Sequence, residues 1–171
     1  MKLLFENWRK FLEEECDEDE VESLATFAHS GQFRRSGEPY IVHPRSVARL
    51  AIHFGYSEAI RDAAFLHDAI EDYKDPKEMS KLIDEVCPEA LPIVKELTHD
   101  KSVAYTDYVL SLSPEAIAVK LLDMYHNSLD LKQGQRQFLK YHNALKSLGG
   151  KPNGITDQHW KALTTKLGVS T

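Results

Sequence analysis

The stretch "FLHDAIEDYKD", residues 65–75, combines the spacing of a packed helix with a cluster of ionisable side chains. Its apolar residues, among them Leu66 and Ile70, recur at the three- and four-residue intervals typical of a helix with one buried face. The ionisable side chains beside that face are His67, Asp68, Glu71 and Asp72. Neighbouring carboxylates repel one another unless water or cations neutralise them. The stretch therefore indicates either a solvated helix end or a helix that helps to bind a cation.

Helical spacing continues along the rest of the chain. Pro76 and Pro114 each follow a helix-capping residue, and Ser57 and Thr156 are two further predicted N-caps. No strand, internal repeat or linker is evident, so we expect one all-α domain over residues 1–171. The segments whose apolar residues predict helices are 21–28, 47–54, 63–70, 79–86, 91–97, 103–112, 117–131, 135–148 and 160–167.

The bulk composition narrows the classes of function. The chain has 171 residues, of which 42% are hydrophobic and 28% charged, as in an ordinary globular protein. Its net charge of −6 argues against a general nucleic-acid binder, which needs a broad basic face, but leaves room for a small anionic ligand. No apolar run is long enough to cross a membrane. Cys16 and Cys87 form no recognisable motif, so we expect no disulfide, a reducing compartment and a cytoplasmic location.

The two ends of the chain carry no catalytic motif. Residues 1–17 are interpreted as an amphipathic helix that docks on the domain, since Phe5, Trp8 and Phe11 recur at helical spacing. Binding to a membrane surface is a weaker alternative, because an acidic run follows and anionic lipids would repel it. The region 135–171 is interpreted as helices that complete the core or form a contact between subunits, which leaves a homo-oligomer open.

Two distant residues complement the cluster at 67–72. His43 lies in "VHP", where a loop enters a helix, and Asp123 lies inside the apolar run "IAVKLLDMYHN". An aspartate in such a run is costly to bury without a partner, and a metal ion would offset that cost. Together with His67 and Asp68 these residues form a ligand set of two histidines and two aspartates. This mixture of nitrogen and oxygen suits Mn²⁺, Fe²⁺ or Zn²⁺ and does not choose among them.

The order and spacing of these residues resemble the HD-domain metal-dependent phosphohydrolases, which are all-helical. The resemblance is closer to the hydrolase domain of the RelA/SpoT alarmone enzymes, in the compact, hydrolase-only form seen in metazoan SpoT homologues. It extends from about residue 20 to 131 and implies a single compact helical bundle with no room for a synthetase or regulatory region. The matching segments, in chain order, are "AHSGQFRRSGEPYIVHP" (28–44), "FLHDAIEDYKD" (65–75), "VKELT" (94–98) and "VKLLDMYHNSLDL" (119–131).

The resemblance implies a role for each matching residue. One divalent metal ion, Mn²⁺ in this family, would be held by His43, His67, Asp68 and Asp123. Glu71 and Asp72 match the pair that activates or orients the attacking water. The nucleotide would be bound by Arg34, Arg35 and Ser36 at its base and phosphates, and by Asn127 near its ribose.

Several substitutions leave the substrate open. Met124 and Tyr125 replace an arginine and a leucine of the family pattern, and "NSLDL", residues 127–131, replaces "NMRTL". The primary hypothesis is a Mn²⁺-dependent pyrophosphohydrolase that converts ppGpp or pppGpp to GDP or GTP. One alternative is an HD nucleotidase or a phosphatase acting on another phosphorylated nucleotide, such as NADPH. Another is a non-catalytic nucleotide sensor.

Two further residues are candidates for a supporting role. His126 is three residues from Asp123 and could face the site, and we interpret it as packing in the core or against the ligands. Lys101 follows "LTHD" and could contact a phosphate.

Overall fold

A computed structural model of the chain describes residues 16–170. The predicted all-α fold class is confirmed, because the regular structure of these residues is helical and their only extended pairing is an isolated bridge between Phe33 and Pro39. The helices are α2 (Glu18–Ala28), α3 (Val42–His53), α4 (Glu58–Leu66), α5 (Ala69–Asp72), α6 (Pro76–Val86), α7 (Ala90–Leu97), α8 (Tyr105–Ser111), α9 (Pro114–Ser128), α10 (Arg136–Ser147) and α11 (Asp157–Leu167).

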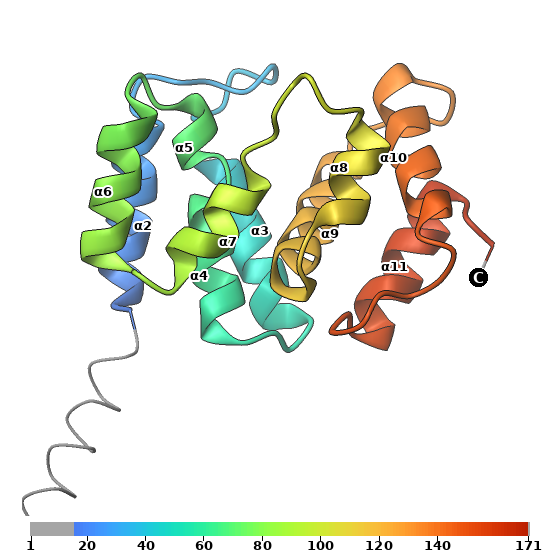
Figure 1. Ribbon diagram of the computed structural model, residues 1–171. Coiled ribbons are helices and arrows are strands. Elements are labelled where there is room, and N and C mark those ends of the chain that lie inside the picture. The colour runs from blue at the N-terminus through green and yellow to red at the C-terminus, as the bar shows by residue number, and fades with distance from the viewer. Residues whose placement is uncertain (1–15, 171) are drawn as a thin grey trace, which may run out of the picture.

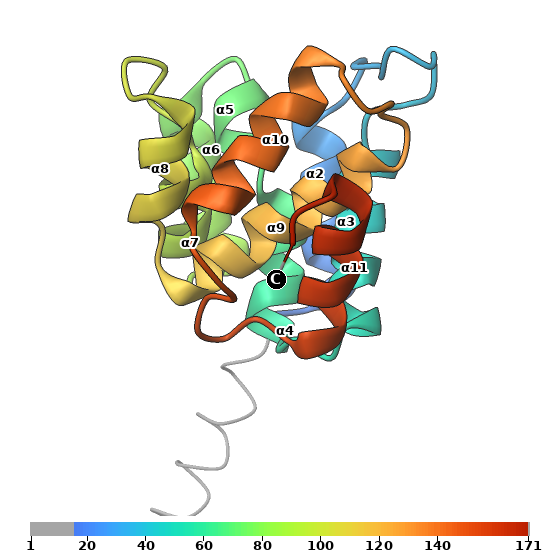
Figure 2. The same ribbon diagram turned by 90° about the vertical axis from the view of Figure 1, so that its right-hand side faces the viewer.

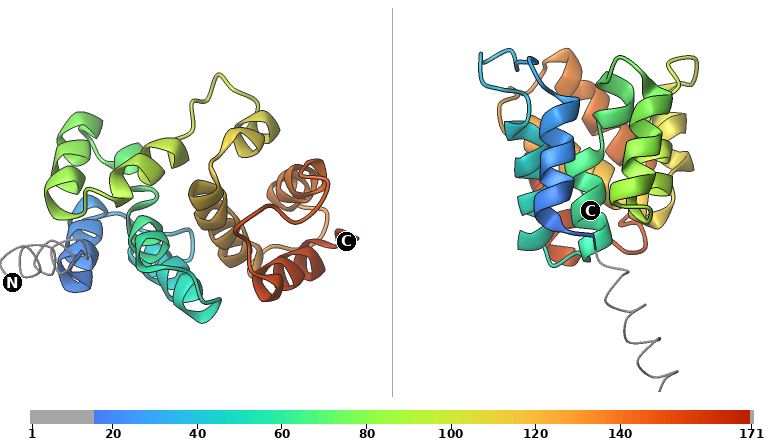
Figure 3. Two further views of the ribbon diagram at one scale, coloured as in Figure 1. Left: turned by 60° about the horizontal axis from the view of Figure 1, so that its bottom comes forward. Right: turned by 90° about the vertical axis from the view of Figure 1, so that its left-hand side faces the viewer.

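The helices are arranged from one end of the molecule to the other. Figure 1 shows α2 and α6 at one end, α10 and α11 at the opposite end, and α3, α4, α7 and α9 between them. The side view in Figure 2 places α10 and α11 in front of α9, and both views in Figure 3 keep α2 beside α6. Helix α9 packs on α3, α4, α7 and α11, so it is the central element of the bundle.

Helix α9 also joins the two clusters of buried residues that form the core. Val119 and Leu122 belong to the cluster built with α2, α3, α4, α6 and α7, whereas Leu121 and Met124 belong to the cluster built with α8, α10 and α11. All four side chains are fully buried. A helix with apolar residues on opposite sides is typical of a buried element, so the sequence of α9 is consistent with its central position.

Helix starts follow the predicted capping signals. The side chains of Asp75, Ser113 and Thr156 each accept a backbone N–H from the first turn of α6, α9 and α11. Ser57 occupies the N-cap position of α4, as predicted, but its side chain forms no capping hydrogen bond. Pro76 stands at the first position of α6, where its missing N–H costs nothing.

The helix expected to continue past Leu66 is interrupted. Helix α4 ends at Leu66, α5 begins at Ala69, and His67 and Asp68 form the turn between them. The His67 ring donates from Nδ1 to the Ala64 carbonyl at 2.8 Å. That carbonyl is the acceptor that a continuing helix would give to the N–H of residue 68, so a local side-chain bond competes with the helix. The assumption of one uninterrupted helical face was therefore wrong at these two residues.

The expectation of unpaired cysteines was also wrong. Cys16 and Cys87 form a disulfide with an S–S distance of 2.07 Å and a Cα–Cα distance of 5.3 Å. The two are 71 positions apart in the chain, but α2 packs on α6, which brings Cys16, two residues before α2, to Cys87, the residue after α6. Sequence spacing could not reveal this proximity. Disulfides are rare in reducing compartments, so the cysteines no longer favour a cytoplasmic location, which stays a prediction.

Two further features concern the N-terminal segment and the possibility of a membrane-spanning helix. The amphipathic helix predicted for residues 1–17 lies almost entirely outside the described residues. Within residues 16–170, no helix is both long enough and apolar enough to cross a membrane.

Candidate metal and nucleotide site

Three segments bring the four predicted ligands to one place. His43 lies on the first turn of α3, one residue inside the helix rather than in the preceding loop. His67 and Asp68 occupy the turn between α4 and α5, and Asp123 lies in the middle of α9. Because α3, α4 and α9 pack on one another, these residues meet although they are up to 80 positions apart in the chain.

The polar atoms of the four side chains face a common point. His43 Nε2 is 3.1 Å from Asp123 Oδ1 and 3.8 Å from Asp68 Oδ2. His67 Nε2 is 3.0 Å from Asp68 Oδ2 and 3.8 Å from Asp123 Oδ1. One ligand atom each of His43, His67 and Asp123 lies within 4.8 Å of the other two, and all three residues are buried. This cluster could hold a metal ion, with Asp68 at its edge.

An unpartnered nitrogen supports the fit of a cation. The Ala64 carbonyl can only accept a hydrogen bond, so the Nδ1 of His67 carries the proton and the Nε2 is left with its lone pair in the neutral ring. This Nε2 is buried and forms no hydrogen bond among the described residues, while Asp68 Oδ2 lies 3.0 Å from it. A buried nitrogen of this kind is costly unless something binds it. An imidazole nitrogen and two carboxylates together can bind a metal ion.

The cluster keeps its carboxylates ionised. Burial acts to raise the pKa of Asp123, but Lys120, whose Nζ lies 2.9 Å from Asp123 Oδ2, and the two histidines hold it well below its usual range. Burial also acts against the charge of Asp68, and His67 outweighs it, so the pKa of this carboxyl is lowered. In the ion-free cluster, burial opposes a charge on His67, but the carboxylates of Asp68 and Asp123 raise its pKa to about 9. Two anionic ligands are therefore available for a cation.

Other residues hold the ligands from behind. Tyr40 Oη donates to Asp68 Oδ2 at 2.8 Å, and Asn127 Nδ2 donates to Asp123 Oδ1 at 2.6 Å. The Nδ1 of His43 lies 2.8 Å from the Nδ1 of His126. Burial, the charge of His43 and the charge of Arg34 lower the pKa of His126 to about 4.

The sequence did not single out Tyr40 or Lys120. Tyr40 is three residues before His43, and Lys120 is three residues before Asp123, so both lie about one turn from a predicted ligand. That spacing was the only signal that could have identified them. The Nζ of Lys120 also lies 5.9 Å from the ring centroids of Tyr105 and Tyr108. Aromatic rings attract a cation at this distance, so these contacts help to accommodate the lysine beside Asp123.

Glu71 and Asp72 lie on α5, directly beyond the His67–Asp68 turn. Glu71 forms an ion pair with Lys101 of the loop before α8. The main-chain carbonyl of Asp72 accepts a hydrogen bond from Gln32 Nε2 at 3.1 Å. Partial burial and the charge of Asp68 raise the pKa of the Asp72 carboxyl. A carboxylate with a raised pKa near this cluster is suited to accept a proton.

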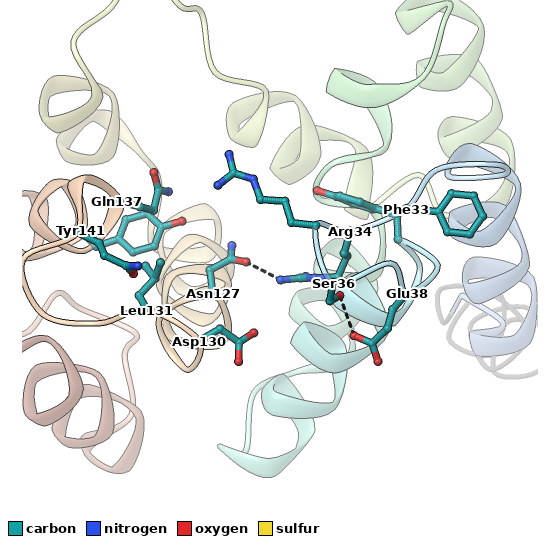
Figure 4. Close-up of a pocket in the computed structure, with 12 residues that line it drawn as sticks. Phe33, Arg34, Ser36, Glu38, Asn127, Asp130, Leu131, Gln137 and Tyr141 are labelled. Carbon is teal, nitrogen blue, oxygen red and sulfur yellow. Dashed lines mark hydrogen bonds between the residues drawn. The ribbon is translucent and has the colours of Figure 1, made fainter.

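A pocket of about 810 Å³ adjoins the cluster and contains the four predicted nucleotide contacts (Figure 4). The loop between α2 and α3 forms one wall, and residues on and after α9 form the other. Arg34 Nη2 bridges the walls by donating to Asn127 Oδ1 at 3.3 Å, and Ser36 Oγ donates to Glu38. The residues that line the pocket are Phe33, Arg34, Arg35, Ser36, Glu38, Tyr40, Asn127, Asp130, Leu131, Gln135, Gln137 and Tyr141.

Hydrogen bonds connect this pocket to the cluster of the four predicted ligands. Asn127 accepts from Arg34 on the pocket side and donates to Asp123 on the other. Tyr40 lines the pocket and donates to Asp68. A ligand in the pocket would therefore lie against residues that fix two of the carboxylates, which is the arrangement required when a metal centre acts on a bound molecule.

Comparison with known proteins finds a family model and curated relatives that match this chain. A family model described as an HD domain matches residues 22–125. A guanosine-3′,5′-bis(diphosphate) 3′-pyrophosphohydrolase of Vibrio cholerae is 41% identical over 81 residues, which are 44% of this chain and 12% of that protein. The bifunctional (p)ppGpp synthase/hydrolase SpoT of Escherichia coli is 31% identical over 141 residues, which are 72% of this chain and 20% of that protein. The chain thus matches a fifth or less of the length of these curated relatives.

A solved structure shares the fold. It is described as a metazoan ortholog of SpoT that hydrolyzes ppGpp and plays a role in starvation responses. The TM-score is 0.70, and the superposition covers 88% of this chain and 95% of the other. Sequence identity is 22%, so this likeness supports the helical architecture and not the chemistry.

Proposed function

The chain belongs to the HD-domain family, and on that premise we propose that it is a metal-dependent 3′-pyrophosphohydrolase of the guanosine alarmones ppGpp and pppGpp. The observation that carries the proposal is the cluster of His43, His67, Asp68 and Asp123 beside a pocket that contains Arg34 and Arg35. The names of the bacterial relatives that match this chain give the substrate class.

His43, His67, Asp68 and Asp123 would hold one divalent ion, Mn²⁺ by analogy with the family. The bound ion would supply a Lewis acid that stabilises negative charge on a phosphoryl oxygen. The remaining work belongs to side chains of the protein. Lys120 keeps Asp123 ionised, and Tyr40 and Asn127 fix the direction of the two carboxylates. The ligands are therefore held in position before the substrate arrives.

Asp72 and Glu71 would serve the attacking water. In the proposed reaction, water adds to the phosphorus bonded to the 3′ oxygen, the bond between these two atoms breaks, and the 3′ oxygen takes up a proton, which gives pyrophosphate and GDP or GTP. The water must lose a proton, and we propose that the carboxylate of Asp72 accepts it, a role that its raised pKa supports. Glu71 is already paired with Lys101, so its part is to orient groups rather than to take the proton.

The nucleotide would occupy the adjoining pocket. The guanidinium groups of Arg34 and Arg35 can offset phosphate charge and stack on a purine, and Ser36 can donate a hydrogen bond. Asn127 would meet the ribose while it also holds Asp123. Binding and positioning would therefore depend on the same hydrogen-bond chain.

A different phosphorylated nucleotide is the second candidate, because the pocket is not strongly cationic. Arg34 and Arg35 are matched by Glu38 and Asp130, so the formal charges of the lining side chains cancel (+2 − 2). An alarmone with pyrophosphate groups at both ends carries more negative charge than such a lining neutralises. A nucleotide with less charge remote from the metal cluster, such as NADPH or a nucleoside monophosphate, would meet less repulsion.

A substrate panel tests the proposal. The purified protein, stripped of metal and reloaded with Mn²⁺, would be given ppGpp, pppGpp, NADPH and nucleoside monophosphates, and released pyrophosphate and orthophosphate would be measured separately. We expect pyrophosphate and GDP or GTP from the alarmones. Release of orthophosphate from another nucleotide, with the alarmones left intact, would contradict the proposed substrate and support the second candidate. Nucleotide binding without turnover of any compound would indicate a sensor and contradict both enzymatic functions.

A further inference from the structure

The buried His43 ring is bonded on its far side by a second histidine. Its Nε2 faces the metal cluster, 3.1 Å from Asp123 Oδ1, and its Nδ1 lies 2.8 Å from the Nδ1 of His126. His126 is three residues after Asp123 on α9. One helix therefore contacts both nitrogens of the same ring, with Asp123 on one side and His126 on the other.

The chemistry of imidazole fixes the proton between the two rings. A neutral imidazole has one N–H and one lone pair, and a metal binds only the lone pair. If the Nε2 of His43 binds an ion, its proton must be on Nδ1. The Nδ1 of His126 must then accept this proton in a hydrogen bond, and the proton of His126 itself must be on Nε2.

We propose that His126 is a positioning residue that accepts a hydrogen bond from His43 Nδ1 and thereby holds the Nε2 lone pair toward the ion. The inference rests on the metal assignment made under the proposed function. It assigns to His126 the part that the Ala64 carbonyl plays for His67. The partner of a ligating histidine commonly fixes the ring and its tautomer in this way.

An imidazole in this position can do what a carbonyl cannot. Without an ion, a proton on His43 Nε2 can bond to Asp123 Oδ1, and His126 can then donate from its own Nδ1 to His43. With an ion, both tautomers reverse and the hydrogen bond between the rings is kept. The pair of rings is therefore satisfied in both states, which lets a buried histidine exchange a carboxylate partner for a metal without leaving a polar atom unpaired.

Variants of His126 test the inference through metal affinity. The protein would be stripped with a chelator, and the dissociation constant of Mn²⁺ would be measured by titration calorimetry without nucleotide. His126→Leu removes the acceptor, and we expect affinity to fall about tenfold or more. His126→Gln keeps an acceptor oxygen, and we expect its affinity to stay within about threefold of the wild type. His53→Leu removes an exposed imidazole away from the cluster and should change nothing.

Nitrogen NMR gives a second readout on the unaltered protein. With ¹⁵N-labelled histidine and diamagnetic Zn²⁺, His43 should be protonated at Nδ1 and His126 at Nε2. Thermal unfolding of the metal-free variants shows whether each is folded. Should His126→Leu fail to fold, His126→Gln and the NMR assignment still decide the matter.

Specific outcomes would overturn the inference. They are unchanged affinity in a folded His126→Leu, an equal loss in His126→Gln, or a His43 ring protonated at Nε2 in the metal-loaded protein. The fate of the proposed substrate is a separate result. A protein that behaves as expected toward metal but leaves ppGpp intact would refute the proposed substrate and leave the role of His126 standing.

Discussion

At Asp123, the cost of burying a charge is offset by contacts from three directions. Lys120 lies 2.9 Å from one carboxylate oxygen, while Asn127 and His43 contact the other at 2.6 and 3.1 Å. A carboxylate held in this way stays ionised and cannot rotate away from the cluster. Asp72 differs from Asp123, because burial and the charge of Asp68 raise its pKa. A raised pKa favours the proposed role of Asp72 as a proton acceptor.

Replacing Asp72 with asparagine tests its proposed role as the proton acceptor. The amide has nearly the same size but cannot take a proton, so we expect turnover to fall about 100-fold or more. Affinity for Mn²⁺ should stay unchanged, because Asp72 is not one of the four ligands. Asp84→Asn, on the exposed side of α6, is the matched control. Full turnover in Asp72→Asn would remove the proton-accepting role.

The raised pKa of His67 predicts how metal affinity depends on pH. In the ion-free protein this pKa is about 9, so the ring carries an extra proton at neutral pH, and the metal must displace it. Apparent affinity should therefore rise by about tenfold for each pH unit between about pH 7 and about pH 9, and level off above. Calorimetry in buffers with different heats of ionisation should detect about one proton released for each ion bound. An affinity that is flat across this range would contradict the contacts described for His67.

Among single residues, the sequence predicted those that belong to a recognisable motif. Their order and residue types match the HD family pattern, which identified the four predicted ligands, and the packing of α3, α4 and α9 brings them together. Tyr40 and Lys120 escaped notice because a tyrosine and a lysine at these positions have no chemical signature until the fold supplies their partners.

At the scale of elements, helix positions were predictable from the 3.6-residue period and from caps, whereas the break between α4 and α5 was not. At the break, the His67 ring donates to the Ala64 carbonyl, and a side-chain bond of this kind is not revealed by periodicity. The disulfide was missed for a similar reason, because the packing of α2 on α6 brings Cys16 and Cys87 together.

The disulfide is expected to stabilise the α2–α6 pair. A covalent link between residues 71 positions apart restricts the unfolded chain, and removing it should cost roughly 2–5 kcal/mol. We therefore expect Cys16→Ser to unfold at a lower temperature than the oxidised wild type. Under reducing conditions, the wild type should approach the midpoint of the variant, and the variant should not change.

Thiol titration of the denatured, unreduced protein is the direct check on this link. The chain has two cysteines, so a complete disulfide leaves no free thiol. Two titratable thiols, with equal midpoints for wild type and Cys16→Ser, would show that the bond does not form in solution.

At the scale of the whole molecule, α9 connects both core clusters and the site. A single domain over residues 1–171 stays a prediction, and this connection is the physical reason to expect cooperative unfolding. Calorimetry should show one transition. Leu122→Ala, in the fully buried face of α9, should lower the free energy of unfolding by about 2–5 kcal/mol.

The control for that substitution is Leu110→Ala on α8, where the side chain is 50% exposed. Its effect should stay near about 0.5 kcal/mol, because little apolar surface is lost. Two separate transitions in the wild type, with Leu122→Ala shifting only one of them, would mean that the two clusters unfold independently.

We propose that one ion, held by four side chains from three segments, is required for hydrolysis of the alarmone. The most direct measurement titrates Mn²⁺ into the metal-stripped protein while following pyrophosphate release from ppGpp. Activity should be absent at the start, rise with added Mn²⁺, and reach its plateau at one bound ion for each chain, whereas Asp123→Ala should stay inactive. Release of pyrophosphate by the metal-stripped protein, or full activity of Asp123→Ala with its ion unbound, would contradict the account.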